Sequence, residues 1–163
     1  MESDLRYLKN TLCIISFLQS HKIDPILYGS IGVSLYLGKF KTFNDIDFLI
    51  EKSWLHERWP ELMELMKEKD YILINEREHE FKNSDGVIVA FAEETVLMRD
   101  KIVGSLNELI VRVIDGINVR TLMPQLFKQA YLFSEKDGYR KHKRGKKDRQ
   151  VIELLNKYIQ RQV

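Results

Sequence analysis

The chain has 163 residues, 44% of them hydrophobic and 31% charged, which is typical of one globular domain and excludes a disordered or collagen-like chain. No apolar run approaches the ~20 residues that a membrane helix needs, so we expect no membrane partner. The single cysteine, Cys13, excludes an internal disulfide and a cysteine-based zinc site. Acidic Glu2 and Asp4 are the wrong charge for a secretory leader, and we expect a cytoplasmic protein.

The formal net charge of +2 hides an uneven distribution. Residues 140–163 hold nine Lys/Arg and two Asp/Glu, whereas the rest of the chain holds 17 and 22. A basic segment on an acidic body is typical of a protein that handles phosphate near its C-terminus. Taken alone, such a charge run is more often a solvated helix start.

The apolar periodicity predicts helices alternating with short strands in the first half of the chain. Apolar residues recur at steps of three and four near the N-terminus, and Ser53 is a candidate cap of a crossover helix. In chain order, the expected elements are a helix at 3–20, a strand at 26–28, a helix at 31–37, a strand at 45–50, a helix at 54–69 and a strand at 71–74.

The second half predicts two antiparallel hairpins and two helices. The expected elements are a hairpin of 79–82 with 87–91, a hairpin of 109–114 with 117–120, a helix at 124–134, a basic loop at 138–145 and a helix at 148–159. We therefore expect one α/β (α+β) domain over residues 1–163, with a small mixed sheet flanked by helices. Its N-terminal helix lies within 1–22 and its C-terminal helices within 122–163.

A pair of carboxylates opens the second predicted strand. Asp45 and Asp47 are alternate residues of a strand, so they project to one face with Cα atoms ~6.5–7 Å apart. Two such carboxylates repel unless a cation lies between them, and Mg²⁺ is bound by one or two carboxylates together with substrate phosphates. An Asp-x-Asp pair alone is more often a solvated strand start.

A second feature, Gly29-Ser30, lies where the first predicted strand meets a helix. A helix N-terminus offers free N–H groups and a positive dipole end to an anion. Gly29 allows close approach of the backbone, and the Ser30 hydroxyl can donate to a phosphate oxygen. A lone Gly-Ser is an ordinary turn, but followed about 15 residues later by Asp-x-Asp it describes a recognisable site.

This arrangement resembles the nucleotidyltransferase superfamily of DNA polymerase β type, and within it the small bacterial branch of lincosamide and aminoglycoside nucleotidyltransferases and minimal nucleotidyltransferases. The segment from Gly116 to Pro124 and the pair Lys147-Asp148 resemble later parts of those families. The resemblance covers about residues 20–160 and implies a nucleotidyltransferase fold.

The resemblance also implies an activity: transfer of a nucleoside monophosphate from an NTP, with ATP expected first, to a hydroxyl of a small molecule or a protein. Asp45 and Asp47 would bind Mg²⁺, and Gly29 and Ser30 would hold the β/γ-phosphates. Lys147, with Lys146 or Arg144 as substitutes, would neutralise phosphate charge, and Lys41 is a further candidate phosphate contact.

Those families carry a third carboxylate on a neighbouring strand, which binds a second metal or deprotonates the acceptor hydroxyl. Its expected place lies within 87–91, at Val89, where no carboxylate stands. Glu80 is the first substitute, because a hairpin loop of two or four residues puts it on the face of Val89. Glu93 is second, although it lies ~13 Å along the strand. His79 is third and would take that face with a three-residue loop.

Three functions therefore remain open at this stage. The first is a Mg²⁺-dependent nucleotidyltransferase. The second is a catalytically impaired relative that binds a nucleotide or a partner, because the third carboxylate is missing from its expected place. The third, ranked last because the body is acidic, is nucleic-acid binding through the basic segment 140–149. The sequence identifies neither the acceptor nor the oligomeric state.

Overall fold

The computed structural model describes the backbone of residues 2–38, 45–136 and 138–162, and the side chains of these residues except 2–5 and 136–147. Its helices are α1 (Glu2–Ser20), α2 (Gly29–Leu37), α3 (Trp59–Glu68), α4 (Val96–Arg99), α5 (Pro124–Lys136) and α6 (Gly138–Arg161). Its strands are β1 (Ile26–Tyr28), β2 (Ile46–Ile50), β3 (Ile72–Asn75), β4 (Glu80–Lys82), β5 (Ile88–Glu93), β6 (Ile110–Ile114) and β7 (Ile117–Thr121).

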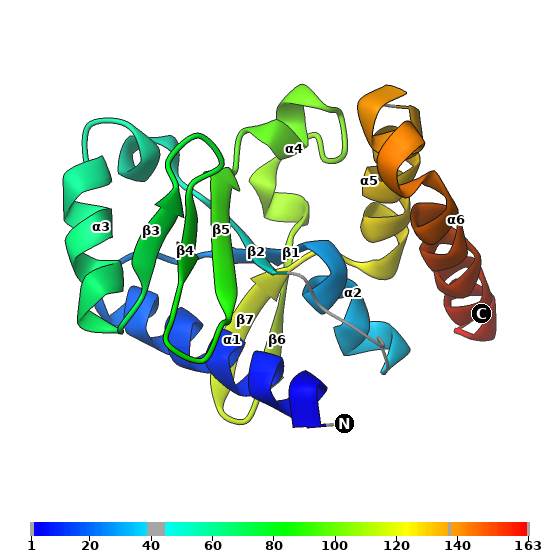
Figure 1. Ribbon diagram of the computed structural model, residues 1–163. Helices are drawn as coiled ribbons and strands as arrows, with labels where there is room; N and C mark the ends of the chain where they lie inside the picture. Colours follow the sequence, from blue (N-terminus) through cyan, green and yellow to red (C-terminus); the bar gives the residue numbers. More distant parts are fainter. Residues whose placement is uncertain (1, 39–44, 137, 163) are drawn as a thin grey trace.

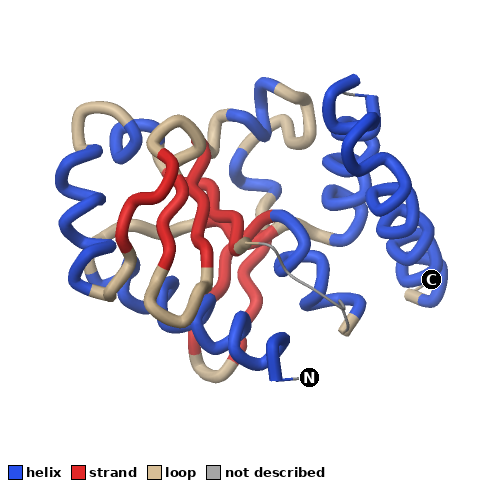
Figure 2. Tube along the Cα trace, in the orientation of Figure 1, coloured by secondary structure: helices blue, strands red, loops and turns tan. Residues whose placement is uncertain are grey.

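The strands form one mixed sheet in the order β3-β4-β5-β2-β1-β7-β6 (Figures 1 and 2). The central strand pairs β2–β5 and β1–β7 are parallel, whereas β1–β2 and the outer hairpins β3–β4–β5 and β6–β7 are antiparallel. The predicted α/β fold with a mixed sheet is confirmed. The connection from β2 through α3 to the β3–β4–β5 hairpins provides the long crossover that the parallel pair β2–β5 needs.

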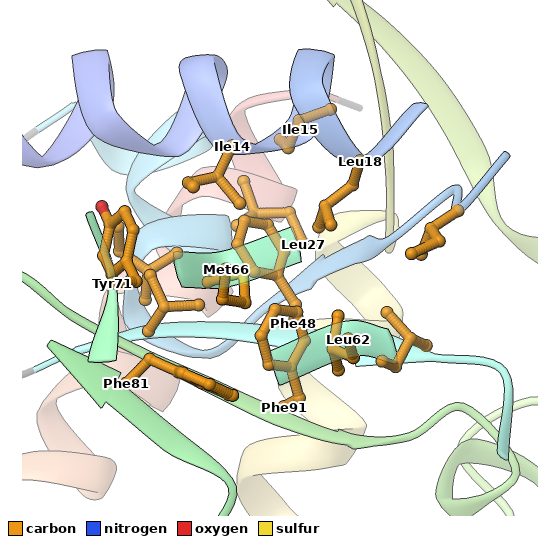
Figure 3. Packing of buried hydrophobic residues seen from close by; sticks show 14 of the residues in the cluster. Ile14, Ile15, Leu18, Leu27, Phe48, Leu62, Met66, Tyr71, Phe81 and Phe91 are labelled. Atoms are coloured by element: carbon orange, nitrogen blue, oxygen red, sulfur yellow. The ribbon is translucent and has the colours of Figure 1, made fainter. Parts of the chain in front are cut away.

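Two apolar clusters lie on the two faces of the sheet. The first packs α1 and α3 on β2, β4 and β5, with Phe48, Phe81 and Phe91 at its centre (Figure 3). The second packs α2, α4, α5 and α6 on the other face, around Leu49 and Phe127. In β2, the odd-numbered residues therefore share the face of the second cluster, and the even-numbered ones share the face of the first.

Two element predictions were wrong. The expected helix at 54–69 is split into a 3₁₀ helix (Lys52–Leu55) and α3, and the Ser53 hydroxyl donates to the Glu51 carboxylate (2.8 Å) instead of capping α3. The expected basic loop at 138–145 belongs to the continuous helix α6. Lys and Arg are good helix formers, and a single interior glycine costs a helix only about 1 kcal/mol.

The other elements agree with the sequence predictions within a few residues. Gly38 ends α2 in the left-handed conformation (φ 81°), as expected of a C-terminal glycine. Asp115 and Gly116 have φ values of 50° and 77°, which suits the two-residue turn of the β6–β7 hairpin. In the part of the chain that the structure describes, no helix combines the length and apolar character required to cross a membrane.

Candidate functional site

The first part of the site is the junction between β1 and α2. Tyr28, the last residue of β1, pairs with Asp47 of β2, and α2 begins at the next residue, Gly29. Gly29 has φ +65°, and a Cβ atom added to it would lie 2.2 Å from Asp47 Oδ2. Only glycine fits there, because any side chain would collide with the carboxylate. The first turn of α2 is thereby held in direct contact with Asp47.

The two aspartates lie at the start of β2, one immediately before the strand and one within it. Both are half-buried. Asp45 is near enough to α1 to contribute to a raised pKa of Tyr7, although burial of that phenol is the larger cause. Its negative charge also helps to raise the pKa of Glu80, after burial of that carboxyl group. The charge of Asp45 is therefore felt both at Glu80 and at Tyr7 of the N-terminal helix.

Glu80 shares a row of the sheet with Asp47. Ala90 of β5 is the register partner of Asp47 in the parallel pair and of Glu80 in the antiparallel pair. Register partners project to the same face, so Asp47, Ala90 and Glu80 lie side by side on one face across three strands. The negative charge of neighbouring Glu78 adds to the raised pKa of Glu80.

An open cleft of about 580 Å³ extends from the contact between Gly29 and Asp47. Ala90 and Ala92 of β5 line it, and α4 and α5 face them with Arg99 and Phe133. Phe133 is 44% exposed. Arg77, in the β3–β4 connection, also lines the cleft. The lining thus combines small side chains, an accessible aromatic ring and charged residues of both signs, since Glu78 and Asp100 lie there as well.

A relative found by sequence comparison identifies the family of this chain. The chain is 32% identical over 145 residues to the uncharacterized protein YnaI of Bacillus subtilis (strain 168), with 88% of this chain and 91% of that protein covered. The chain belongs to the YnaI family. No protein-family model matches the sequence.

Solved structures identify the fold of this YnaI-family chain. An antigenic nucleotidyltransferase-like protein from Paracoccidioides brasiliensis superposes with a TM-score of 0.63 at 18% identity, covering 92% of this chain and 75% of that one. The antibiotic-resistance factor ANT(2'')-Ia gives 0.63 at 13% identity, with coverage of 93% and 84%. Lincomycin-bound lincosamide antibiotic adenylyltransferase LnuA gives 0.60 at 14%, with 91% and 95%. The nucleotidyltransferase fold suggested by the sequence is confirmed.

In this YnaI-family chain, the residue of β5 beside Asp47 is Ala90, and not Val89 as the sequence predicted. The Asn83 N–H donates to the Val87 carbonyl oxygen (3.0 Å), so only three residues, 84–86, form the hairpin loop. This loop length pairs Phe81 with Val89, and Val89 is fully buried on the face of α1 and α3. The position on the face of Asp47 is Ala90. Glu80 lies on that face because the loop has three residues and pairs it with Ala90, whereas the prediction assumed a loop of two or four residues and a shared face with Val89.

The other two candidate substitutes for the third carboxylate contact aromatic side chains outside the row of Asp47. Glu93 pairs with Ile50 at the far end of β5 and hydrogen-bonds to the His56 ring (2.5 Å). This hydrogen bond holds the pKa of Glu93 below its usual range. The His79 ring packs edge-on against Trp59, with 5.0 Å between the ring centroids. Both residues line the cleft, but neither shares the row of Asp47, whereas Glu80 does.

The predicted cationic residues of this nucleotidyltransferase fold are not part of the described site. Lys41 lies in 39–44, outside the described residues, and the side chains of Arg144, Lys146 and Lys147 lie outside them as well. Sequence reasoning in turn missed Arg77 and Arg99, since exposed residues in connections and on helix surfaces carry no periodic signal. Among the described side chains, no three His, Cys, Asp or Glu residues come together as a metal-holding group.

Proposed function

We propose that this protein is a metal-dependent nucleotidyltransferase that moves a nucleoside monophosphate from an NTP to a hydroxyl and releases pyrophosphate. The observation that carries the proposal is the contact of Gly29 with the Asp47 carboxylate. It brings a helix N-terminus, which suits phosphate, against a carboxylate, which suits a metal ion. A shared fold with an adenylyltransferase and an antibiotic-resistance factor supports the same chemistry.

The phosphates of the nucleotide would lie at the start of α2. The first N–H groups of a helix have no partner within the helix and carry the positive end of its dipole. Gly29 and Ser30 are the first two residues of α2. Their N–H groups and the Ser30 hydroxyl would hold the β/γ-phosphates, and the glycine lets the phosphates approach the backbone closely.

Asp45 and Asp47 have the chemistry to hold a magnesium ion. Mg²⁺ prefers oxygen ligands and is bound through one or two carboxylates, with substrate phosphates and water completing its shell. Two half-buried carboxylates beside a phosphate-binding helix start fit this preference. A bound ion would neutralise charge on the attacking and leaving oxygens.

Isothermal titration calorimetry tests this function. The wild-type protein is titrated with each of the four NTPs in the presence of Mg²⁺, and ATP is expected to bind. The same titration on Asp45→Ala/Asp47→Ala is expected to show no binding. A wild-type protein that binds no NTP would rule the function out, and unchanged binding by the double variant would remove the two aspartates from the site.

A second candidate function is a nucleotide-binding protein without transfer activity. Ala90 favours it, because β5 brings a methyl group and not a carboxylate beside Asp47. Incubation with α-³²P-labelled NTPs separates the two functions. Label transferred by the wild type and lost in Glu80→Gln supports the enzyme, whereas binding without any transfer supports the second candidate.

A further inference from the structure

The strand beside Asp47 carries only apolar side chains next to the two aspartates. This strand, β5, lies directly beside β2 in the sheet (Figure 1). Ala90 is the register partner of Asp47, and the same parallel register brings Ile88 beside Asp45, two residues earlier on each strand. Divalent ions bind to oxygen, nitrogen and sulfur atoms. Neither the methyl group of Ala90 nor the side chain of Ile88 has such an atom.

The next strand along the sheet, β4, adds one carboxylate and one cation to the same face. Glu80 pairs with Ala90, and Lys82 pairs with Ile88. Neighbouring strands lie ~4.8 Å apart, so the Cα atom of Glu80 is about 9.6 Å from that of Asp47. In the described part of the chain, no group of three acidic or histidine side chains is arranged to hold an ion. Glu80 therefore stands apart from the pair of aspartates.

Lys82 makes a further cation on this face less favourable. Its side chain is exposed, and it belongs to the row of Ile88. Two strand spacings, about 9.6 Å, separate its position from the row position of Asp45. This distance is within the Debye length of ~10 Å at 0.1 M salt, so the ammonium group is not fully screened from the site. Its charge repels a metal ion that lies over β5.

The two aspartates by themselves suit one divalent ion. Mg²⁺ is bound through one or two carboxylates, with substrate phosphates and water completing its shell. Sites with two ions hold them ~3.5–4 Å apart, so the second ion needs protein ligands beyond those that the two ions share. Asp47 contacts Gly29 on one side and has Ala90 on the other. A second ion over Ala90 would find no side-chain oxygen on β5.

We infer that this chain binds one divalent ion with each nucleotide, because the residues beside Asp47 provide no ligand for a second ion. The inference rests on the proposed function and adds to it the number of ions. The nucleotidyltransferases that the sequence resembles carry a third carboxylate on a strand next to the aspartates, and this chain departs from them at Ala90. Asp45 and Asp47 are thereby left as the side-chain ligands of a single ion.

Counting bound Mn²⁺ on the full chain tests the inference. Electron paramagnetic resonance follows a Mn²⁺ titration of the protein with equimolar α,β-methylene-ATP, and a titration of the nucleotide alone is the blank. The wild type is expected to bind one Mn²⁺ per chain, with the spectrum of an isolated ion. Ala90→Asp is expected to bind two, with a spectrum broadened by spin exchange because the ions lie ~3.5–4 Å apart. Ala90→Asn, of the same size without the charge, is the matched control and should bind one.

The outcomes separate the inference from the function on which it rests. No binding of Mn²⁺ with nucleotide by the wild type would overturn both. Two ions per wild-type chain would overturn the inference alone, and a return to one ion in Glu80→Gln would then identify Glu80 as the additional ligand. A single ion in folded Ala90→Asp would overturn the assignment of the ion number to Ala90. The wild-type count decides the inference even where Ala90→Asp does not fold.

Discussion

The two sides of the site are built in different ways. On the side of β1 and α2, the backbone of Gly29 touches the Asp47 carboxylate, and nothing larger than a hydrogen fits between them. On the side of β4 and β5, the register partner of Asp47 is Ala90, which contributes only a methyl group, and the surface is open. The comparison teaches that the side of Gly29 tolerates almost no change, whereas the side of Ala90 has room for variation.

The largest expected effect comes from Gly29→Ala on the tightly packed side. The new Cβ would collide with Asp47 Oδ2. The alanine would also have to adopt the left-handed backbone conformation (φ +65°) that the glycine has at this position. We expect a loss of about 3 kcal/mol in the free energy of unfolding, from the strained backbone and the overpacking together. Urea denaturation measures this loss, and calorimetry should show no ATP binding.

Gly116→Ala is the matched control for that substitution. Gly116 also has a left-handed backbone (φ +77°), but an added Cβ would meet nothing within 4 Å. This variant should lose only the backbone term, about 1 kcal/mol, and should bind ATP normally. Equal effects of the two substitutions on ATP binding would show that the contact with Asp47 is irrelevant to the site.

A somewhat smaller effect is expected from Gly32→Ala, which tests how the packing of α5 holds α2 in place. A Cβ at Gly32 would lie 2.5 Å from Phe127 Cζ, where α2 packs against α5. Overpacking of this kind costs about 2 kcal/mol. Thermal unfolding followed by circular dichroism should show a lower midpoint, and ATP binding should weaken because α2 shifts. Unchanged stability would indicate that α5 moves away freely.

On the open side, Ala90→Asp should restore a carboxylate beside Asp47. With nucleotide present, we expect Mn²⁺ to bind about tenfold more tightly, which corresponds to 1.4 kcal/mol. Without metal, the new carboxylate opposite Asp47 should lower the unfolding midpoint, because like charges on paired strands repel. Electron paramagnetic resonance and thermal unfolding in EDTA measure the two effects. Mn²⁺ affinity that does not rise would show that β5 lies too far from the ion.

The smallest expected effect is the pH dependence of Glu80. Its pKa is raised in the folded protein, mainly by burial and then by the charges of Asp45 and Glu78. The folded state then binds a proton more tightly than the unfolded state, so stability falls as pH rises through the usual glutamate range toward neutrality. Glu80→Gln removes this loss and should be slightly more stable than the wild type at pH 7.

Urea denaturation in EDTA at pH 7 and at pH 4 checks that prediction. The advantage of Glu80→Gln should shrink at the lower pH, where Glu80 is mostly protonated in both states. Glu64→Gln, on the exposed surface of α3, is the control and should show no such difference. A stability gain that is the same at both pH values would assign the effect to packing and not to charge.

The sequence was informative where local rules decide the structure. The spacing of apolar residues located α1, β2 and both hairpins, and Gly29-Ser30 with Asp45 and Asp47 pointed to the fold. The sequence prediction failed at Val89. The face on which a hairpin residue lies depends on the length of the loop, and the turn residues 83–86 are compatible with several lengths. The sequence reasoning also missed Arg99, whose place in the cleft depends on how α4 packs on the sheet.

A crystal structure with α,β-methylene-ATP and Mg²⁺ tests the central claim most directly. The account predicts phosphates on the N–H groups of Gly29 and Ser30, and an ion held by Asp45 and Asp47 with Glu80 outside its coordination shell. A nucleotide bound away from the start of α2, or an ion without either aspartate, would contradict it.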